Sequence, residues 1–302
     1  MKLLVTGASG IAGTKLCHLA SNRQYRVFSA YDQHVPLFGT PTRLDVTDRQ
    51  AMEKVFERTS PDAVIHAAAL TDVDKCEREK ETALKTNAEA TGQIAELCRR
   101  HRSFLVYVST DYVFNGEKGM YKETDPPNPV NNYGLTKLAG EKLVQQSSAE
   151  HCVARTSVIY GANAATGKAN FTLWLLERLR QKEWTKIVTD QWNSPTLNTN
   201  LAEMILEIVE RKITGTFHLS GATRISRFEF AKKIANIFDE ESSHLIPVPS
   251  TEMQWIAKRP EDSSLDVSRA SSILNAKPLE LTKALKLMRQ EMHSGEAPAR
   301  AN

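Results

Sequence analysis

The sequence predicts an α/β fold: a Rossmann-type doubly wound parallel sheet with a smaller, interleaved C-terminal lobe. In the first half of the chain, short apolar runs alternate with amphipathic helical patterns, which is typical of βαβ units and a parallel sheet. The first apolar run leads directly into a glycine-rich turn and then into a helical pattern. Beyond residue 160 the alternation becomes irregular, which indicates a second lobe.

Composition and charge exclude several classes of protein. The chain has 302 residues, 25% of them charged and 41% hydrophobic, and no segment approaches the roughly 18 consecutive apolar residues of a membrane span, so we expect no membrane partner. A net charge of +3 without a clustered basic stripe argues against a nucleic-acid partner. The first apolar run begins too early to leave room for a signal peptide, so we expect a cytoplasmic protein with buried free cysteines.

The strands of the first half are expected where short unbroken apolar runs suit burial on both faces of a sheet. They are Lys2–Thr6, Tyr25–Ala30, Ala63–Ala69, Phe104–Ser109 and His151–Arg155. Helices are expected at Arg49–Arg58, with Asp48 as N-cap, and at Thr82–Arg102. Three prolines within residues 124–129 exclude helix and central strand, so a surface loop should lead into a helix at Tyr133.

The second half is expected to interleave with the first. Residues 1–160 should form the Rossmann domain, to which 197–220 returns, and residues 161–196 and 221–294 should form a substrate-binding lobe. A polar loop is expected at Asp190–Asn200, and the small polar tail 295–302 should be flexible. The elements expected in this half are Phe171–Arg180, Leu201–Arg211 and Arg227–Phe238 as helices and Thr216–Leu219 as a strand.

The glycine-rich turn is a candidate dinucleotide site. Glycines permit a tight turn and close approach of the backbone to a pyrophosphate, and the N–H groups and dipole of the following helix attract negative charge. An ordinary turn can use the same residues, but the position between a strand and a helix favours the cofactor. The expected contacts are Gly7, Ser9, Gly10, Ile11, Ala12 and Gly13.

The GxxGxxG spacing resembles that of the short-chain dehydrogenase/reductase superfamily. Asp32, at the end of the second strand, can accept hydrogen bonds from the adenosine ribose, which favours NAD over NADP; the alternative is a solvated turn aspartate. The superfamily resemblance implies an adenine contact after the next strand, and small side chains leave room for the cofactor beside the sheet. These further cofactor positions are Asp45 and Val46, and Ala67, Ala68 and Ala69.

Tyr133 and Lys137 form a YxxxK motif, and residues four apart share one face of a helix. A cation close to a phenol stabilises phenolate and lowers its pKa, so Tyr133 is the candidate proton donor to a carbonyl oxygen. An exposed helical pair is the alternative for the motif alone. Thr110 ends a strand upstream, at the sheet edge where ligands bind in open α/β folds, and can hydrogen-bond the same oxygen, while Lys137 can reach the nicotinamide ribose.

Longer motifs give a specific resemblance. Residues 66–75, 108–116, 125–129, 133–141, 155–157, 194–196 and 259–260 resemble, in order, the dTDP-4-dehydrorhamnose reductase family of extended short-chain dehydrogenases. The resemblance implies an NADPH- or NADH-dependent reductase that delivers hydride to the C4 ketone of a nucleotide-linked deoxysugar. It implies a catalytic triad and two substrate contacts. The triad is Thr110, Tyr133 and Lys137, and the substrate contacts are Thr71 and Asp111.

Some features depart from the family or stay open. Val158 stands where family members usually place a tryptophan against the sugar, so the substrate is expected to be dTDP-4-dehydrorhamnose or another ketosugar nucleotide. Asn87 is either a cofactor-side contact or a helix-packing amide. Cofactor preference is open because Arg23 or Arg43 can offer a charge to a 2′-phosphate. Some family members form a homodimer bridged by magnesium through glutamates, but no matching cluster is placed here.

Three other functions share much of the same pattern. A sugar-nucleotide C4 epimerase uses the same triad and differs in retaining its cofactor, whereas a 4,6-dehydratase needs an Asp-Glu pair where this chain has Asp111 followed by Tyr112. The regulatory beta subunit of methionine adenosyltransferase resembles the same family and acts by association. The full set of catalytic side chains favours an enzyme.

Overall fold

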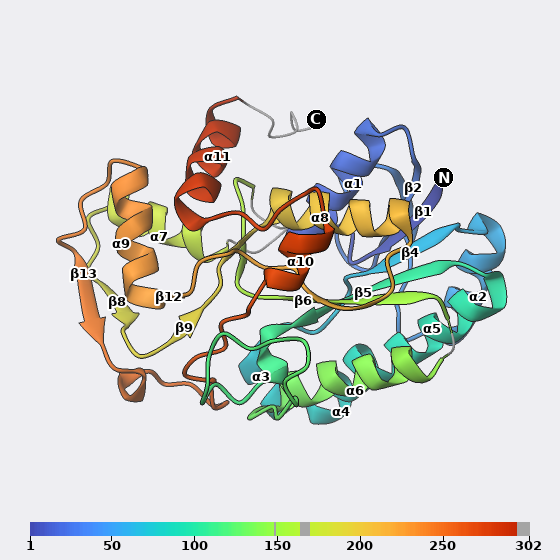
Figure 1. Ribbon diagram of the computed structural model, residues 1–302, viewed down its shortest axis with the longest axis horizontal. Coiled ribbons are helices and arrows are strands. Elements are labelled where there is room, and N and C mark those ends of the chain that lie inside the picture. Colours follow the sequence, from blue (N-terminus) through green and yellow to red (C-terminus); the bar gives the residue numbers. More distant parts are fainter. Residues whose placement is uncertain (148, 164–169, 295–302) are drawn as a thin grey trace.

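The computed structural model describes residues 1–147, 149–163 and 170–294 (Figure 1). At its centre is a seven-stranded sheet of order β11-β6-β5-β4-β1-β2-β3, whose neighbouring strands all run parallel. The predicted doubly wound α/β fold is confirmed. The strands are β1 (Lys2–Thr6), β2 (Arg26–Tyr31), β3 (Thr40–Arg43), β4 (Ala63–His66), β5 (Phe104–Thr110), β6 (His151–Thr156) and β11 (Gly215–His218).

Helices cover both faces of this sheet (Figure 1). Successive strand residues point to opposite faces, so Leu3 and Val5 of β1 join one apolar cluster and Leu4 joins the other. The first face packs on α1 (Ile11–Asn22), α8 (Asn198–Arg211) and α10 (Ser268–Ile273). The second packs on α2 (Arg49–Thr59), α5 (Ala90–His101) and α6 (Asn132–Gln146).

The C-terminal lobe is built differently, from helices and very short strands. Its own apolar cluster lies among α7 (Phe171–Arg180), α9 (Arg227–Ile237) and α11 (Leu281–His293). Three two-stranded sheets accompany them: β7 (Ile159–Tyr160) with β10 (Thr196–Leu197), β9 (Trp192–Asn193) with β12 (Ile225–Ser226), and β8 (Thr185–Val188) with β13 (Leu245–Val248). β11 lies between lobe segments in the sequence but pairs with β6 at the edge of the main sheet. The exact lobe boundaries stay a prediction.

Short helices complete the description. They are α3 (Val73–Arg78), α4 (Lys80–Leu84), the π-helical η1 (Lys85–Glu89) and the 3-10 helices η2 (Asp111–Val113) and η3 (Ser250–Glu252). Asp48 caps α2 as predicted, because its carboxylate accepts a hydrogen bond from the N–H of Ala51 at 3.0 Å. All four cysteines are free and buried, also as predicted.

Several predicted elements differ from the structure. The strand predicted at Ala63–Ala69 ends at His66, because the alanines leave the sheet at its carboxyl edge. The single helix predicted at Thr82–Arg102 is α4, η1 and α5 in succession, with a π-helical turn between two α-helices. The predicted loop at Asp190–Asn200 contains β9, β10 and the start of α8. Sequence analysis missed β3, α3 and α11, and the tail predicted at 295–302 lies outside the described residues.

The last helix is tied to the first. Lys15 of α1 is 5% exposed, and its ammonium lies 3.4 Å from a carboxylate oxygen of Glu291 in α11. The same oxygen accepts a hydrogen bond of 2.6 Å from the Thr199 hydroxyl in α8. Residues far apart in the sequence therefore meet in one buried cluster beside the glycine loop's helix.

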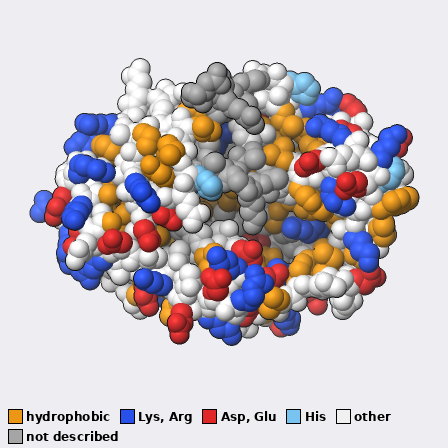
Figure 2. All heavy atoms as spheres, turned by 180° about the vertical axis from the view of Figure 1, so that it is seen from behind, with side chains coloured by type: hydrophobic (Ala, Val, Ile, Leu, Met, Phe, Trp, Pro, Cys, Tyr) orange, Lys and Arg blue, Asp and Glu red, His pale blue; other side chains and the backbone are white. Residues whose placement is uncertain are grey.

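Two surface features bear on possible partners. Acidic and basic side chains are interspersed over the face seen in Figure 2. No helix in the described part of the chain is both long enough and apolar enough to cross a bilayer.

Candidate active site

The glycine loop is folded so tightly that side chains are excluded. Gly7 has a φ of 68°, and a Cβ there would lie 2.7 Å from the backbone nitrogen of Ala68. A Cβ on Gly13 would lie 2.1 Å from the carbonyl oxygen of Gly7. Gly10 is the N-cap of α1 and offers no side chain to the N–H groups of the first turn. This cradle of bare backbone at a helix N-terminus fits the diphosphate of a dinucleotide.

The other predicted cofactor residues follow the strands β2, β3 and β4, and they differ in exposure. Asp32 directly follows β2 and is exposed, where its carboxylate faces solvent. One oxygen of Asp45 accepts 2.8 Å hydrogen bonds from the N–H and hydroxyl of Thr47, and Val46 belongs to the core under α2. Asp45 and Val46 thus shape the turn before α2. Ala67, Ala68 and Ala69 are partly buried beside Gly7.

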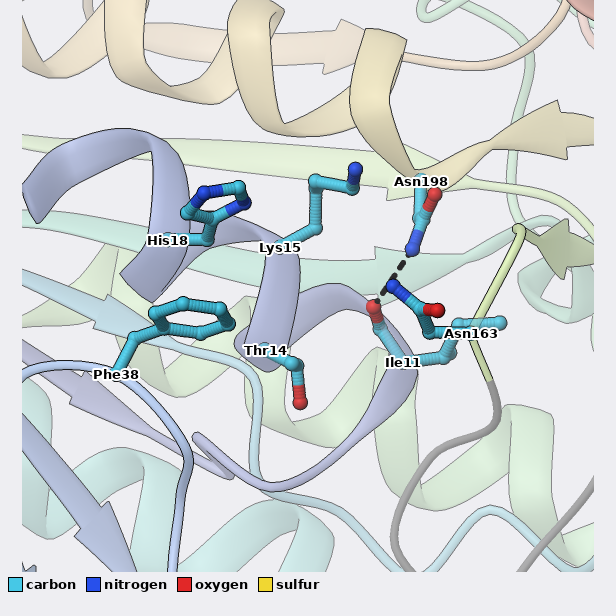
Figure 3. Close-up of a pocket in the computed structure, with 7 residues that line it drawn as sticks. All are labelled: Ile11, Thr14, Lys15, His18, Phe38, Asn163 and Asn198. Atoms are coloured by element: carbon cyan, nitrogen blue, oxygen red, sulfur yellow. Dashed lines mark hydrogen bonds between the residues drawn. The ribbon is translucent and has the colours of Figure 1, made fainter. Parts of the chain in front are cut away.

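A polar pocket lies along α1 (Figure 3). The side chain of Asn198 donates a 3.2 Å hydrogen bond to the carbonyl of Ile11, and His18 stacks on Phe38 at 4.4 Å. Lys15 points toward α8, and Glu291 of α11 compensates its charge. The pocket is lined by Ile11, Thr14, Lys15, His18, Phe38, Asn163 and Asn198.

Local packing positions Tyr133 at the start of α6. Asn131 caps the helix by accepting a 2.9 Å hydrogen bond from the N–H of Gly134. Gly134 allows α6 to approach η2 closely, since a Cβ there would lie 2.1 Å from the carbonyl oxygen of Tyr112. The rings of Tyr112 and Tyr133 meet edge to face at 5.9 Å. Tyr133 is thereby held beside the carboxyl end of β5, where Thr110 is the last strand residue.

Lys137 lies one turn further along α6 and is 2% exposed. Its ammonium donates a 2.8 Å hydrogen bond to the carbonyl of Val108 and lies 4.1 Å above the Tyr107 ring. Burial lowers the pKa of Lys137 to about 7, an effect that Glu141 partly opposes. Burial also raises the pKa of Tyr133 above its usual range, although a hydrogen bond with Thr110 lowers it. The net shift is therefore opposite to the lowering of the phenol's pKa that the sequence predicted.

Thr110 and Asp111 form a buried polar cluster. The Thr110 hydroxyl donates to Asp111 Oδ1 at 3.0 Å and accepts from the N–H of Tyr112 at 3.2 Å. Asp111 Oδ2 accepts from the hydroxyls of Ser157 at 2.8 Å and Ser263 at 2.6 Å. Burial raises the pKa of the Asp111 carboxyl, and these hydrogen bonds lower it. Both oxygens of Asp111 are occupied by hydroxyls of its own chain, so this carboxylate joins η2 to the C-terminal lobe.

Asn87 in η1 is a packing amide. Its Oδ1 accepts from the N–H of Leu70 at 2.8 Å, and its Nδ2 donates to the Leu70 carbonyl and the Thr136 hydroxyl, both at 3.1 Å. Asn87 thereby ties the segment after β4 to α6 and holds the exposed Thr71 next to Leu70. Of the two roles open for Asn87, the structure shows the structural one.

A buried chain of hydrogen bonds around His66 was missed by sequence analysis. Thr6 accepts from the N–H of Ala68 at 3.3 Å and meets His66 Nδ1 at 2.7 Å, while Nε2 lies 3.0 Å from the Thr91 hydroxyl. Thr91 donates to the carbonyl of Asn87 at 2.8 Å. Burial, followed by the charge of Lys137, lowers the pKa of His66 to about 3, so the ring is neutral. A histidine inside an apolar strand was the available signal.

Sequence analysis also missed Arg227. This residue is the first of α9, and its guanidinium lies 4.6 Å above the Phe171 ring. Arg259, which the motif comparison noted, donates a 2.7 Å hydrogen bond to Asp74 Oδ1. The C-terminal lobe thus brings two cations close enough to Tyr112 to act on it electrostatically.

Within the described chain, no group of three or more His, Cys, Asp or Glu side chains is arranged to hold a metal ion. Nothing therefore supports the magnesium site that the resemblance raised.

Comparisons with known proteins agree on one family. Residues 1–294 match the family model of the RmlD substrate binding domain. The crystal structure of a dTDP-4-dehydrorhamnose reductase from Bacillus anthracis, in complex with NADP, is similar with a TM-score of 0.87 at 30% identity, covering 96% of this chain and 99% of that chain. A dTDP-4-dehydrorhamnose reductase from Aggregatibacter actinomycetemcomitans is 32% identical over 304 residues, 95% of this chain and 98% of that protein.

A relative of another kind also matches. The beta subunit of methionine adenosyltransferase 2 from Bos taurus is 30% identical over 280 residues, covering 90% of this chain and 82% of that protein.

Proposed function

The chain belongs to the RmlD substrate binding domain family, that of the dTDP-4-dehydrorhamnose reductases, and on this premise we propose that it reduces the C4 ketone of dTDP-4-dehydrorhamnose or a close analogue. It is an NAD(P)-dependent oxidoreductase that acts on a sugar nucleotide. The observation that carries the proposal is the position of Tyr133 beside the carboxyl end of β5. Because neighbouring parallel strands end at one edge, the glycine cradle after β1 opens on the same side.

The glycine cradle and the alanines after β4 would hold the dinucleotide, whose nicotinamide supplies the hydride when bound. We assign Tyr133 Oη as the group that carries the proton to the C4 oxygen, because a raised pKa keeps the phenol protonated at neutral pH. Lys137, with a pKa near 7, can be charged or neutral and gains charge when a polar ligand faces it. Thr110 fixes the position of the oxygen, and Thr71 borders the substrate.

Direct turnover tests the proposal. Purified protein is mixed with dTDP-4-dehydrorhamnose and either NADH or NADPH, and the loss of reduced nicotinamide is followed. We expect turnover with at least one cofactor; the two are compared because Asp32 favours NADH whereas the Bacillus anthracis relative was solved with NADP. Absence of turnover with both cofactors would sink the substrate assignment. Retention of oxidised cofactor, without net consumption, would identify a C4 epimerase instead.

The similarity to the methionine adenosyltransferase beta subunit favours a second candidate, a partner-binding role. Mixing the protein with a methionine adenosyltransferase catalytic subunit and measuring the mass of the species in solution tests it. The same measurement on the protein alone tests the proposed homodimer. A complex without sugar-nucleotide turnover would favour the regulatory role over the enzymatic one.

A further inference from the structure

Arg227 occupies an electrostatically unfavourable position. It is the first residue of α9, whose N-cap Ser226 accepts a 3.1 Å hydrogen bond from the N–H of Glu229. The N-terminus of a helix carries partial positive charge, so a guanidinium there is opposed by the helix dipole. Burial lowers the pKa of Arg227 below its usual range, and its electrostatic neighbours are Tyr112, Asp111 and the like-charged Arg259.

The acids around Arg227 are committed elsewhere. Among the residues that the structure describes, no carboxylate lies within 4.0 Å of its guanidinium. Glu229 pairs with Lys232 at 2.9 Å, and Asp74 accepts from Arg259 at 2.7 Å and from two backbone N–H groups. Asp111, the acid that acts on Arg227 electrostatically, already accepts three hydroxyl hydrogen bonds.

Two other arginines close to aromatic rings in the lobe are paired with acids, whereas Arg269, 4.5 Å from the Phe217 ring, has no described acid but is exposed to solvent. Arg178 lies 5.7 Å above Trp174 and is bound to Glu183 at 2.8 Å, and Arg224 lies 5.4 Å above Trp192 and is bound to Asp262 at 2.6 Å. Arg227 has the ring of Phe171 at 4.6 Å but no described acid. Arg227 is partly buried, and a desolvated cation without an anion costs free energy, so the position is explained if a ligand supplies the anion.

We propose that Arg227 binds the diphosphate of the sugar-nucleotide substrate and so fixes the distance from that diphosphate to Tyr133. This inference rests on the proposed function, because in a nucleotide that carries an uncharged deoxysugar the negative charge lies on the diphosphate. The planar guanidinium offers two parallel N–H groups to two phosphate oxygens. Tyr112 links the two residues: it acts electrostatically on Arg227, and its ring meets that of Tyr133.

Calorimetric titration with dTDP tests the inference without any turnover. We expect Arg227→Gln to weaken dTDP binding about ten- to a hundredfold, the usual loss for a charge-assisted hydrogen-bonded pair. The dTDP affinity of Arg227→Lys should lie between those of the parent and Arg227→Gln, because lysine keeps the charge but loses the two parallel N–H groups. Arg178→Gln, at a ring-stacked but acid-paired arginine of the same lobe, should bind dTDP like the parent. Unchanged affinity for NADPH shows that each variant is folded.

Turnover separates this inference from the proposed function. In an active enzyme, Arg227→Gln should raise KM for the sugar nucleotide about ten- to a hundredfold, with a much smaller effect on kcat. If the parent binds dTDP through Arg227 but reduces no dTDP-4-dehydro sugar, the substrate assignment fails and the diphosphate contact stands. The inference is overturned if Arg227→Gln binds dTDP within twofold of the parent, or if the parent does not bind dTDP.

Discussion

Two successive turns of α6 bury opposite charges in very different surroundings. Lys137 is 2% exposed and has a backbone carbonyl and an aromatic ring as partners. Glu141, four residues later and 1% exposed, accepts from the Ser109 hydroxyl at 2.6 Å and from Arg155 at 2.7 and 3.0 Å. The charge of the second turn is paired with an opposite charge, although Arg155 Nη1 has no described hydrogen-bond partner, whereas the charge of the first turn is not paired.

The difference separates a charge that the fold neutralises from one to which we assign a function. Glu141 and Arg155 neutralise each other, so the pair has little to gain from a ligand. Burial lowers the pKa of Lys137 and raises that of Tyr133, so it disfavours the charged form of both side chains. This cost stays until a polar ligand lies against them. Strain of this kind is common at active sites and is maintained by well-packed surroundings. Substitutions at Tyr133 and Lys137 change the first turn, and a substitution at Glu141 changes the second.

The largest effect is expected at Tyr133. Tyr133→Phe removes the proposed proton donor with little change in volume, so we expect kcat to fall by about a thousandfold or more while NAD(P)H still binds. Tyr160→Phe is the matched control, because the buried Tyr160 hydroxyl has no partner among the described residues. Steady-state kinetics and cofactor titration measure both. A Tyr133→Phe enzyme with the parental rate would refute the assigned acid.

A smaller effect, on stability rather than activity, is expected at Glu141. Glu141→Ala leaves the buried Arg155 without its acid, and breaking such a pair usually costs about 3–5 kcal/mol of unfolding free energy. Glu53→Ala removes an exposed partner of Arg49 on α2 and should cost less than about 1 kcal/mol. Urea denaturation compares the two. Equal losses would show that the second turn of α6 is not the structural one.

The smallest effect concerns Lys137 and depends on pH. Its pKa of about 7 in the folded protein lies below the ordinary 10.5, so the unfolded chain binds more protons between these values. Stability should therefore rise as pH increases from about 7 to about 10.5, and this contribution is lost as pH falls through that window. Lys137→Met should be inactive but at least as stable as the parent near pH 7, with a weaker pH dependence. Urea denaturation at several pH values tests this, and identical pH slopes in both proteins would contradict it.

The sequence predicted the sheet half better than the lobe. β1, β2, β5 and β6 are long apolar runs buried on both faces, and such runs can be recognised without knowledge of their partners. β3 was missed because Thr40–Arg43 is short, contains a proline and lies at the sheet edge. The two-residue strands β9 and β10 depend on tertiary contacts, which local pattern does not carry.

The same limit applies to the site. Motif spacing was enough to propose the glycine loop and the YxxxK pair, because both are local in sequence. It could not show that the Asp111 carboxylate is occupied by Ser157 and Ser263, since those contacts span 46 and 152 residues. Nor could it show that no described carboxylate lies within 4.0 Å of the Arg227 guanidinium. Charge balance depends on the whole fold.

The contact between Lys15 and Glu291 has a consequence for how the protein is made. A ribosome releases α1 early, but Lys15 meets its acid only after α11 has been synthesised. Similarly, β11 can pair with β6 at the sheet edge only after about 60 further residues have been synthesised. During synthesis α1 therefore carries an uncompensated ammonium on a face that is later buried. Completion of the sheet half is a late event in translation, although most of that half is encoded first.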